Sequence, residues 1–548
     1  MERTIIETPR QADRRTEALS RVQEEMRKEG IGAWVALIDP NHPGQSKAER
    51  FFSKVDRTAR LKYIAFIYPD RQPLAFVQQL ERDKFNVFEG NGGTVVEWDK
   101  AKMKELLKGV RRIAIDWDPV HPFSAHSLCP QRFREFLVSK LDEVEFASSA
   151  RLSKIVEELL PEMPPPEFKR VRRKHVRKDF PELMKQEGVD AWVTFISPVE
   201  RSEAHDMFFM EATPPALGVI KKDGTAVVIS TTERSPGEVA AWLASVIRKA
   251  AVIAMDLPKG GAFTKMPSVP ASVYDFVKEA TGVQVVSSDL LMLRACTEWD
   301  TGALKAHRKA ARNLELIINE SFNAIRAAVS EGKTIQELEV SRLIKQRFAE
   351  LGMTSRSEPI VASGPNSALL HHKPVEGNTR EIGRGDVVII DICARMDAPE
   401  SPYADITWVA FVGTREEVPE KVKRAFSAVT AARDSVLKEI ERRIALGLPL
   451  VAAELDGPGR ELIRRAGFPD YSRLHGTGHS LGFSDAHGIA QNISPLVQGE
   501  LHPNVGYTIE PGIYLPREFG VRSEINFFYN GKSVQVTTVV QGELLFLL

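Results

Sequence analysis

The sequence predicts two tandem α/β domains followed by a larger α+β domain. An internal repeat runs through the first ~300 residues, and a proline-rich seam separates its two copies. Beyond the repeat, the pattern changes to long amphipathic helices followed by short strands that carry acidic residues. A chain of 548 residues is also too long for one hydrophobic core. We expect the domains at 1–162, 163–296 and 297–548.

The repeat consists of three segments that recur in the same order and at similar spacing. The pairs are VQEEMRKEGIGAWVALI (22–38) with FPELMKQEGVDAWVTFI (180–196), RRIAIDWD (111–118) with AAVIAMDL (250–257), and VEFASSARLSKIVEE (144–158) with VQVVSSDLLMLRACT (283–297). The first pair shows a helix, a glycine and a strand, which is typical of an α/β unit. Between the copies, LPEMPPPEF (160–168) contains consecutive prolines that cannot continue a helix, so this segment is predicted to be a stiff linker.

The third domain is predicted to begin with two helices. Residues 302–329 place Leu314, Ile317, Ile318, Phe322 and Ile325 on one helical stripe that ends near Gly332. Thr334 and Glu337 have the spacing of a capping box ahead of a second helix, which stops at Gly352.

Composition and charge exclude several classes of protein. Lys+Arg and Asp+Glu both number 74, so the net charge does not favour binding to nucleic acid or an acidic membrane. A local basic run at 169–178 is interpreted as a solvated helix face or linker, with nucleic-acid binding as the alternative. The three cysteines argue against a disulfide framework and favour a reducing compartment. The N-terminus lacks the apolar core of a signal peptide, and no apolar run reaches the ~18 residues of a membrane span, so we expect a cytoplasmic protein.

Candidate metal ligands follow one another along the last third of the chain. Asp391 ends an apolar strand in GDVVIIDIC (385–393), and Asp405 lies in the strand YADITWVAF (403–411). Carboxylates on neighbouring strands can converge, because a sheet holds paired residues about 5 Å apart. His475 and His479 lie among glycines in LHGTGHSLG (474–482), where an extended chain would keep both imidazoles on one face.

Two further strands complete the set. Glu510 ends a strand in YTIEPGIYL (507–515), where Pro511 and Gly512 force a turn. GVRSEINFF (520–528) places Arg522, Glu524 and Asn526 on one face. Four carboxylates and one imidazole suit Mn²⁺, Co²⁺, Fe²⁺ or Zn²⁺ in a two-ion cluster. Two such ions share a hydroxide that is nucleophilic near neutral pH.

Each feature alone has an ordinary structural interpretation. A strand-end aspartate is usually a turn residue, His475 alone is more often a structural histidine, and Glu-Pro-Gly alone is a turn. GTGHSLG faintly resembles a glycine-rich nucleotide loop, but no βαβ context supports that function. The ordered combination of all five segments is what favours a metal site.

These segments resemble the pita-bread metallopeptidase family, which includes methionine aminopeptidase, aminopeptidase P, prolidase and creatinase. The resemblance covers about 300–548, and the preceding repeat resembles the N-terminal domain of aminopeptidase P and creatinase, present twice. The layout is similar to that of the long cytosolic aminopeptidases P. The resemblance implies hydrolysis of an Xaa-Pro bond, at the N-terminus of peptides or in dipeptides, by a hydroxide that bridges two divalent ions. Mn²⁺ is the first choice of metal, with Co²⁺, Fe²⁺ or Zn²⁺ as alternatives.

The resemblance also implies a role for each site residue. Asp391 is the ligand of one metal alone, Asp405 and Glu524 are bridging carboxylates, and His479 and Glu510 are ligands of the other metal. Glu510 would also carry the proton from water to the leaving amine. His371, in SGPNSALLHH (363–372), would steady the tetrahedral intermediate, His475 would contact the substrate carbonyl, His487 would be a further pocket histidine, and Arg522 would orient Asp391.

Three departures from the family pattern concern the substrate rather than the metals. Asp391 and Asp405 are 14 residues apart, which lengthens the hairpin loop, and His479 to His487 spans one residue more than usual. The Thr-Arg-Thr that often follows the second aspartate is Ile406-Thr407-Trp408 here, which we expect to remove a charge near the pocket.

The expected partner is a short peptide with proline after its N-terminal residue, and the expected assembly is a homodimer. The two repeats are expected to shape the substrate entrance and the dimer without doing chemistry. A creatinase-like hydrolase of a small non-peptide C–N bond remains an alternative. So does a non-catalytic interaction protein on the same fold, although such relatives have generally lost ligands.

Overall fold

The computed structural model divides into two compact units, Ile5–Ala295 and Cys296–Leu548. It describes residues 9–38, 48, 51, 63–77, 94–97, 103, 105–108, 110–117, 129–141, 144–159, 174–197, 208–209, 212, 214–232, 234–257, 268–398, 400–469, 475–495 and 497–548. The predicted linker at 160–168 lies outside these ranges, as does the first half of the basic run, whose residues 174–178 begin helix α6 (Lys174–Gln186). Within the described ranges, no helix has the length and apolar character needed to cross a membrane.

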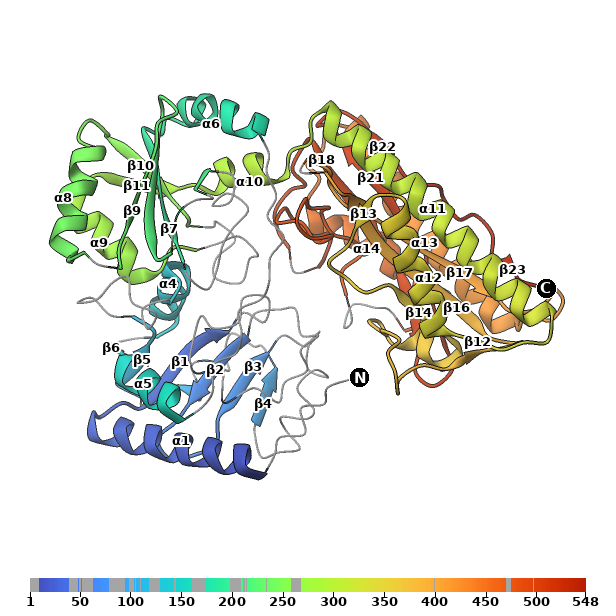
Figure 1. The fold of residues 1–548 in the computed structure, drawn as a ribbon, viewed down its shortest axis with the longest axis horizontal. Helices are drawn as coiled ribbons and strands as arrows, with labels where there is room; N and C mark the ends of the chain where they lie inside the picture. Colours follow the sequence, from blue (N-terminus) through green and yellow to red (C-terminus); the bar gives the residue numbers. More distant parts are fainter. Residues whose placement is uncertain are drawn as a thin grey trace. The chain divides into compact units, whose positions relative to one another are not determined.

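The first unit contains a six-stranded sheet in the order β4-β3-β2-β1-β5-β6 (Figure 1). Its elements are α1 (Pro9–Lys28), β1 (Ala33–Ile38), β2 (Tyr63–Ile67), β3 (Leu74–Val77), β4 (Thr94–Glu97), β5 (Arg112–Ile115), α4 (Gln131–Lys140), β6 (Glu145–Ser148) and α5 (Ala150–Leu159). Alternate residues of β1 face opposite layers, as expected for an extended strand. Trp34 packs with α1 and α5, whereas Val35 packs with Phe133 of α4.

The same unit contains a five-stranded sheet in the order β11-β10-β7-β8-β9. Its elements, after α6, are β7 (Ala191–Ile196), β8 (Ala216–Lys221), β9 (Ala226–Ser230), α8 (Pro236–Val246), β10 (Val252–Met255), α9 (Ala271–Thr281), β11 (Gln284–Ser287) and α10 (Asp289–Thr297). In both sheets the first strand pairs antiparallel with the next strand and parallel with a later one. The sheets thus share the order of pairing that the repeat predicts, while the domain boundaries 1–162, 163–296 and 297–548 stay a prediction.

Equivalent residues of the two repeats make equivalent buried hydrogen bonds. Trp34 donates through Nε1 to Oδ1 of Asp116 at 3.2 Å, and Trp192 donates through Nε1 to Oδ1 of Asp256 at 3.0 Å. Both aspartates are buried. Each also accepts from the hydroxyl of a serine that follows the next strand, Ser149 or Ser288. These strand-end aspartates therefore satisfy buried donors within their own sheets.

The second unit packs helices against both faces of a mixed sheet (Figure 1). Its elements are α11 (Thr301–Ser330), β12 (Ile335–Gln336), α12 (Glu337–Glu350), β13 (Met353–Thr354), β14 (Ile360–Ser363), η3 (Gly364–Ala368), β15 (Glu381–Ile382), β16 (Val387–Met396), β17 (Ala404–Phe411), α13 (Glu420–Ala445), α14 (Ala452–Arg465), β18 (Val505–Ile509), β19 (Gly512–Leu515), β20 (Phe519–Arg522), β21 (Ile525–Tyr529), β22 (Val534–Val536) and β23 (Leu545–Phe546). The main sheet has the order β13-β16-β17-β23, with β14 also paired to β16.

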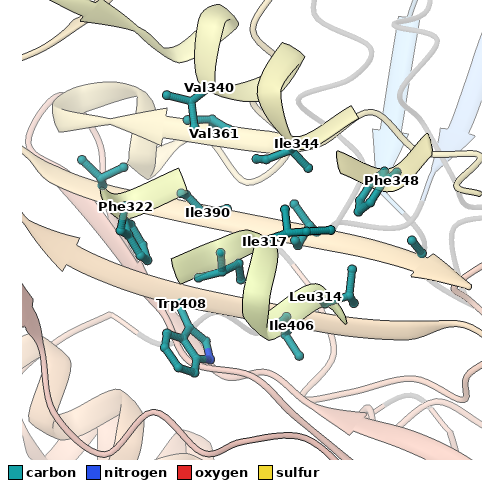
Figure 2. Close-up of a cluster of buried hydrophobic side chains, with 14 of the residues drawn as sticks. Leu314, Ile317, Phe322, Val340, Ile344, Phe348, Val361, Ile390, Ile406 and Trp408 are labelled. Atoms are coloured by element: carbon teal, nitrogen blue, oxygen red, sulfur yellow. The ribbon is translucent and has the colours of Figure 1, made fainter. Parts of the chain in front are cut away.

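The main core of this unit lies between helices α11 and α12 and one face of the strands β16 and β17 (Figure 2). The predicted stripe of α11 supplies Leu314, Ile317 and Phe322, which meet Ile390 and Ile406. The opposite face of β16 and β17 packs against α13, β19 and β20 through Ile389 and Val409, among others. Because side chains alternate along a strand, Asp391, Asp405 and Thr407 lie on this second face.

Two local expectations were wrong. Helix α12 is capped by Gln336, which forms a capping box with Glu339, and not by Thr334 with Glu337. Glu337 is instead fully buried, because it accepts hydrogen bonds from Ser363 and pairs with His372. Strand β16 does not end at Asp391 but continues to Met396, since Ile392, Ala394 and Met396 keep facing the core.

Candidate metal centre

Two neighbouring strands place the first pair of carboxylates on one face. In the antiparallel ladder of β16 and β17, Asp391 is opposite Thr407 and Cys393 is opposite Asp405. Asp391 and Asp405 are therefore diagonal neighbours, a relation that brings side chains of a sheet within reach of each other. Pairing continues to Ala394 and Ala404, so residues 395–403 form the connection between the strands.

Asp405, His479 and Glu524 form a buried cluster. One ligand atom from each of these residues lies within 4.8 Å of the other two, and all three side chains are buried. Nε2 of His479 lies 3.6 Å from Oδ2 of Asp405 and 3.6 Å from Oε1 of Glu510. The structure thus brings four of the five predicted ligands into direct proximity.

Asp391, the fifth predicted ligand, is connected to this cluster through Arg522. Nη2 of Arg522 donates to Oδ2 of Asp391, and its Nε donates to Oγ1 of Thr407 at 3.1 Å. Thr407 in turn donates to Oε2 of Glu524 at 2.8 Å. The structure therefore pairs Arg522 with Asp391, as the family resemblance implies, and it adds Thr407 as a link between Arg522 and Glu524.

The glycine-rich segment at 475–482 runs alongside strand β18 and is hydrogen-bonded to it. Nδ1 of His479 lies 3.0 Å from the carbonyl oxygen of Ser480, so an Nδ1–H tautomer would present the lone pair of Nε2 to a cation. The main chain of His479 is fixed by reciprocal hydrogen bonds with Thr508. A Cβ at Gly478 would lie 2.1 Å from the carbonyl oxygen of Thr508, which explains why this position needs glycine.

The remaining predicted histidines surround the cluster at different distances. The ring of His487 stacks on His479 with 3.9 Å between centroids. Nε2 of His475 accepts from the hydroxyl of Tyr514 at 3.0 Å, and that hydroxyl accepts from Nη1 of Arg522 at 3.1 Å. Burial, with a contribution from the nearby Arg522, lowers the pKa of His475 to about 3, so this imidazole is neutral.

His371 is half-buried in the turn that follows η3. That short helix packs against β16 and β20, the strands that carry Asp391 and Arg522. Oγ of Ser367 in η3 accepts a hydrogen bond of 2.8 Å from the main-chain N–H of Gly520. The segment that carries His371 is therefore anchored beside the strands of the cluster.

Sequence reasoning missed Thr407 and Tyr514 as members of the site. Thr407 follows Asp405 by two residues, and this period-two spacing could have assigned it to the same face. Trp408 points the other way, into the core beneath α11 (Figure 2), whereas Thr407, which stands where the family's Thr-Arg-Thr has arginine, lies on the face of the site. Tyr514 lies in β19 and reaches the site only because β19 pairs with β20.

The electrostatics of the cluster require a compensating positive charge. Burial, strengthened by Asp405 and Asp391 and opposed by His479 and Arg522, raises the pKa of Glu510 to about 7. Burial, strengthened by Asp405, Glu510 and Asp391, raises the pKa of Glu524 well above its usual range. Oε1 of Glu524 is also buried without a hydrogen-bond partner. A buried carboxylate oxygen with no donor is costly, so these residues fit divalent cations.

Comparison with known proteins shows that this fold is that of a metallohydrolase. The pattern of metallopeptidase family M24 matches residues 305–529. The Xaa-Pro dipeptidase of Pyrococcus furiosus is 30% identical over 272 residues, which are 49% of this chain and 69% of that protein. A putative Xaa-Pro aminopeptidase of Mycoplasma pneumoniae is 33% identical over 34% of this chain and 49% of its own length. The chain belongs to metallopeptidase family M24.

Solved structures share the fold at lower identity. The X-prolyl aminopeptidase of Caenorhabditis elegans is 15% identical, with a TM-score of 0.66 over 96% of this chain and 91% of that one. The X-Pro aminopeptidase of Thermotoga maritima is 22% identical, with a TM-score of 0.50 over 68% of this chain and 99% of that one. The expected combination of α/β N-terminal domains with an α+β pita-bread domain is thereby confirmed.

Proposed function

We propose that this chain hydrolyses the Xaa-Pro bond, at the N-terminus of short peptides or in Xaa-Pro dipeptides, with two divalent metal ions. The observation that carries the proposal is the buried cluster of Asp405, His479 and Glu524, with Glu510 beside it and an oxygen of Glu524 that lacks a hydrogen-bond donor. Relatives with this family's pattern are named Xaa-Pro dipeptidase and putative Xaa-Pro aminopeptidase.

In this proposal the five predicted ligands hold the metals: Asp391, Asp405, His479, Glu510 and Glu524. Mn²⁺ is the proposed metal, because carboxylate oxygens dominate the donor set. When bound, the two ions supply a nucleophile at neutral pH and polarise the scissile carbonyl. The tautomer of His479 presents Nε2 to a cation, and the elevated pKa of Glu510 describes the protein without such cations.

The other residues orient the substrate and the ligands. Arg522 holds Asp391 and Tyr514 from one guanidinium group, which limits the rotation of both side chains. His475, which the pKa of about 3 keeps neutral, is proposed to contact the substrate carbonyl. His371 and His487 are proposed as pocket histidines, and the stacking of His487 on His479 supports this for His487. Glu510 is proposed to transfer a proton to the leaving amine.

We further propose a cytoplasmic homodimer without a nucleic-acid partner. The three cysteines are free thiols, which is consistent with a reducing compartment. Equal numbers of cationic and anionic residues provide no general attraction to nucleic acid. Two-fold dimers are the commonest assembly of soluble proteins, so light scattering coupled to size exclusion should give twice the mass of one chain.

A panel of substrates tests the proposed function. It compares Xaa-Pro dipeptides, Xaa-Pro-Yaa tripeptides and matched Xaa-Ala peptides with creatine as a small non-peptide amidine, all in the presence of Mn²⁺. We expect cleavage only where proline follows the first residue. Cleavage of creatine alone would favour a creatinase-like hydrolase. Loss of all hydrolysis with two ions bound would favour the non-catalytic alternative.

A further inference from the structure

Helix α14 carries a buried ion pair that none of the roles above uses. Asp456 and Arg460 are one helical turn apart and are 1% and 5% exposed. Nη2 of Arg460 donates to Oδ1 of Asp456 at 2.8 Å, and Nε donates to Oδ2. A buried ion pair is weak evidence for stability, because the cost of desolvating both charges offsets their attraction. The external contacts of this pair therefore indicate what it does.

Both members of the pair bind the segment that precedes His479. Nη2 of Arg460 donates to the carbonyl oxygen of His475 at 3.1 Å. Oδ1 of Asp456 accepts from the main-chain N–H of Thr477 at 3.2 Å and from its hydroxyl at 2.7 Å. The pair thus holds both ends of the three-residue turn 475–477 from one side.

The far side of this turn faces the metal centre. The carbonyl oxygen of Thr477 accepts from the main-chain N–H of Glu510 at 2.7 Å. The imidazole of His475 contacts Tyr514, whose hydroxyl is held by Arg522. A displacement of the turn would therefore move His475 and Glu510 without removing any ligand.

We propose that Asp456 and Arg460 are positioning residues that fix His475 and Glu510 for hydrolysis through Thr477. This inference rests on the proposed function. A misplacement of about 1 Å in an active site can cost on the order of 10²-fold in rate, so loosening the turn should lower kcat even when the metals stay bound.

Three substitutions test the proposal in the full-length, metal-loaded protein. Thr477→Val removes the hydroxyl that donates a hydrogen bond to Asp456 but keeps the shape of the side chain. Thr477→Ser retains that hydroxyl. Asp456→Asn weakens the hydrogen bonds that this side chain accepts from both Thr477 and Arg460. The matched control is Glu461→Gln, because Glu461 pairs with Arg465 at 2.8 Å on the same helix at the same spacing but on the exposed surface.

We expect Thr477→Val and Asp456→Asn to lower kcat for an Xaa-Pro peptide about tenfold or more, with KM changed less than about threefold. Elemental analysis should find the same number of ions per chain as in the parent protein. Thr477→Ser should recover most of the rate, and Glu461→Gln should match the parent. If the two residues only stabilised the fold, Thr477→Val and Asp456→Asn would lower the unfolding temperature, and kcat would not differ between Thr477→Val and Thr477→Ser in this way.

A second readout needs no substrate. In the Zn²⁺-loaded proteins, the NMR signal of the His475 ring, assigned by its absence in His475→Gln, should shift in Thr477→Val and Asp456→Asn and stay in place in Glu461→Gln. If the parent protein cleaved no Xaa-Pro peptide, the proposed function would fail while this readout still tested the positioning. The positioning itself is overturned if the folded, metal-loaded Thr477→Val protein keeps the parental kcat and the parental His475 signal.

Discussion

The hydroxyl of Thr407 in β17 donates a hydrogen bond of 2.8 Å to Oε2 of Glu524, which lies between β20 and β21. Oγ1 of Thr407 also accepts a hydrogen bond of 3.1 Å from Nε of Arg522. Thr407 is completely buried, so no water can replace these contacts directly. The orientation of one proposed bridging ligand thus depends on a side chain that is not itself a ligand.

Replacing Thr407 by valine should weaken metal binding without removing a ligand. Outer partners of metal ligands typically contribute 10–100-fold in affinity, so we expect a rise in the metal Kd of about that size. Thr407→Ser retains the hydroxyl and is the control. Calorimetric titration of the chelated proteins with Mn²⁺ measures the effect, and equal affinities for the valine and serine variants would contradict it.

Arg522→Lys should be more damaging than its conserved charge indicates. The planar guanidinium reaches Asp391, Thr407 and Tyr514 in three directions, which an ammonium group cannot do from one position. We expect kcat to fall on the order of 10-fold or more. Arg415→Lys, at an exposed ion pair with Glu543, is the matched control and should keep the parental rate. A variant with lysine at 522 and full activity would show that charge alone suffices there.

Glu510→Gln should lower kcat by about 10²-fold or more, with a smaller change in KM, because the amide cannot accept a proton. His371→Ala should also lower kcat but should retain its metals, since His371 is proposed to contact the intermediate and not the ions. Steady-state kinetics and elemental analysis on the same samples test this pair. A His371→Ala protein that lost metal and kept its rate would reverse the two assignments.

The pH dependence of stability should include a contribution from His307 of helix α11. Burial lowers the pKa of His307 to about 4, and its ring nitrogens contact the carbonyl oxygen of Tyr403 and the hydroxyl of Thr537. Since the unfolded chain binds this proton at higher pH, the stabilisation is complete above about pH 6.5 and is lost as the pH falls toward 4. Between about pH 7.5 and 5 the loss is about 2 kcal/mol.

Urea unfolding of the parent protein and of His307→Gln at both pH values isolates this contribution. The difference between the two proteins cancels the titration of the carboxylate cluster, which is common to both. We expect the gap in unfolding free energy between the parent and His307→Gln to narrow at the lower pH, because only the parent then takes up a proton at His307 when it unfolds, which favours unfolding. A gap that stayed constant would show that folding does not lower the pKa of His307.

The sequence predicted features that depend on local pattern and missed those that depend on tertiary contact. The apolar stripe of α11 follows from periodicity within one segment, and the repeated α/β units follow from the recurrence of three segments along the chain. The capping box was misassigned because the side chain of Glu337 is buried, where it forms hydrogen bonds with Ser363 and His372, which lie 26 or more residues away. Local propensity cannot reveal such a partner.

The same distinction holds within the metal centre. Asp405, His479 and Glu524 were predicted because their residue types and order match a known family, and the structure places them together. The hydrogen bonds of Asp456 and Arg460 to residues 475–477 could not be predicted, because a charged pair at helical spacing is usually a solvated surface pair. Burial, which only the fold shows, distinguishes it from the neighbouring pair of Glu461 and Arg465.

The proposed function requires that hydrolysis of Xaa-Pro bonds depend on ions held by the buried carboxylate cluster. Its most direct test measures bound metal and the rate of cleavage of one Xaa-Pro peptide on the same sample, during stepwise addition of Mn²⁺ to chelated protein. We predict no cleavage without metal and a rate that saturates as two ions bind per chain. Full cleavage by verifiably metal-free protein, or no cleavage of any Xaa-Pro peptide with two ions bound, would contradict the account.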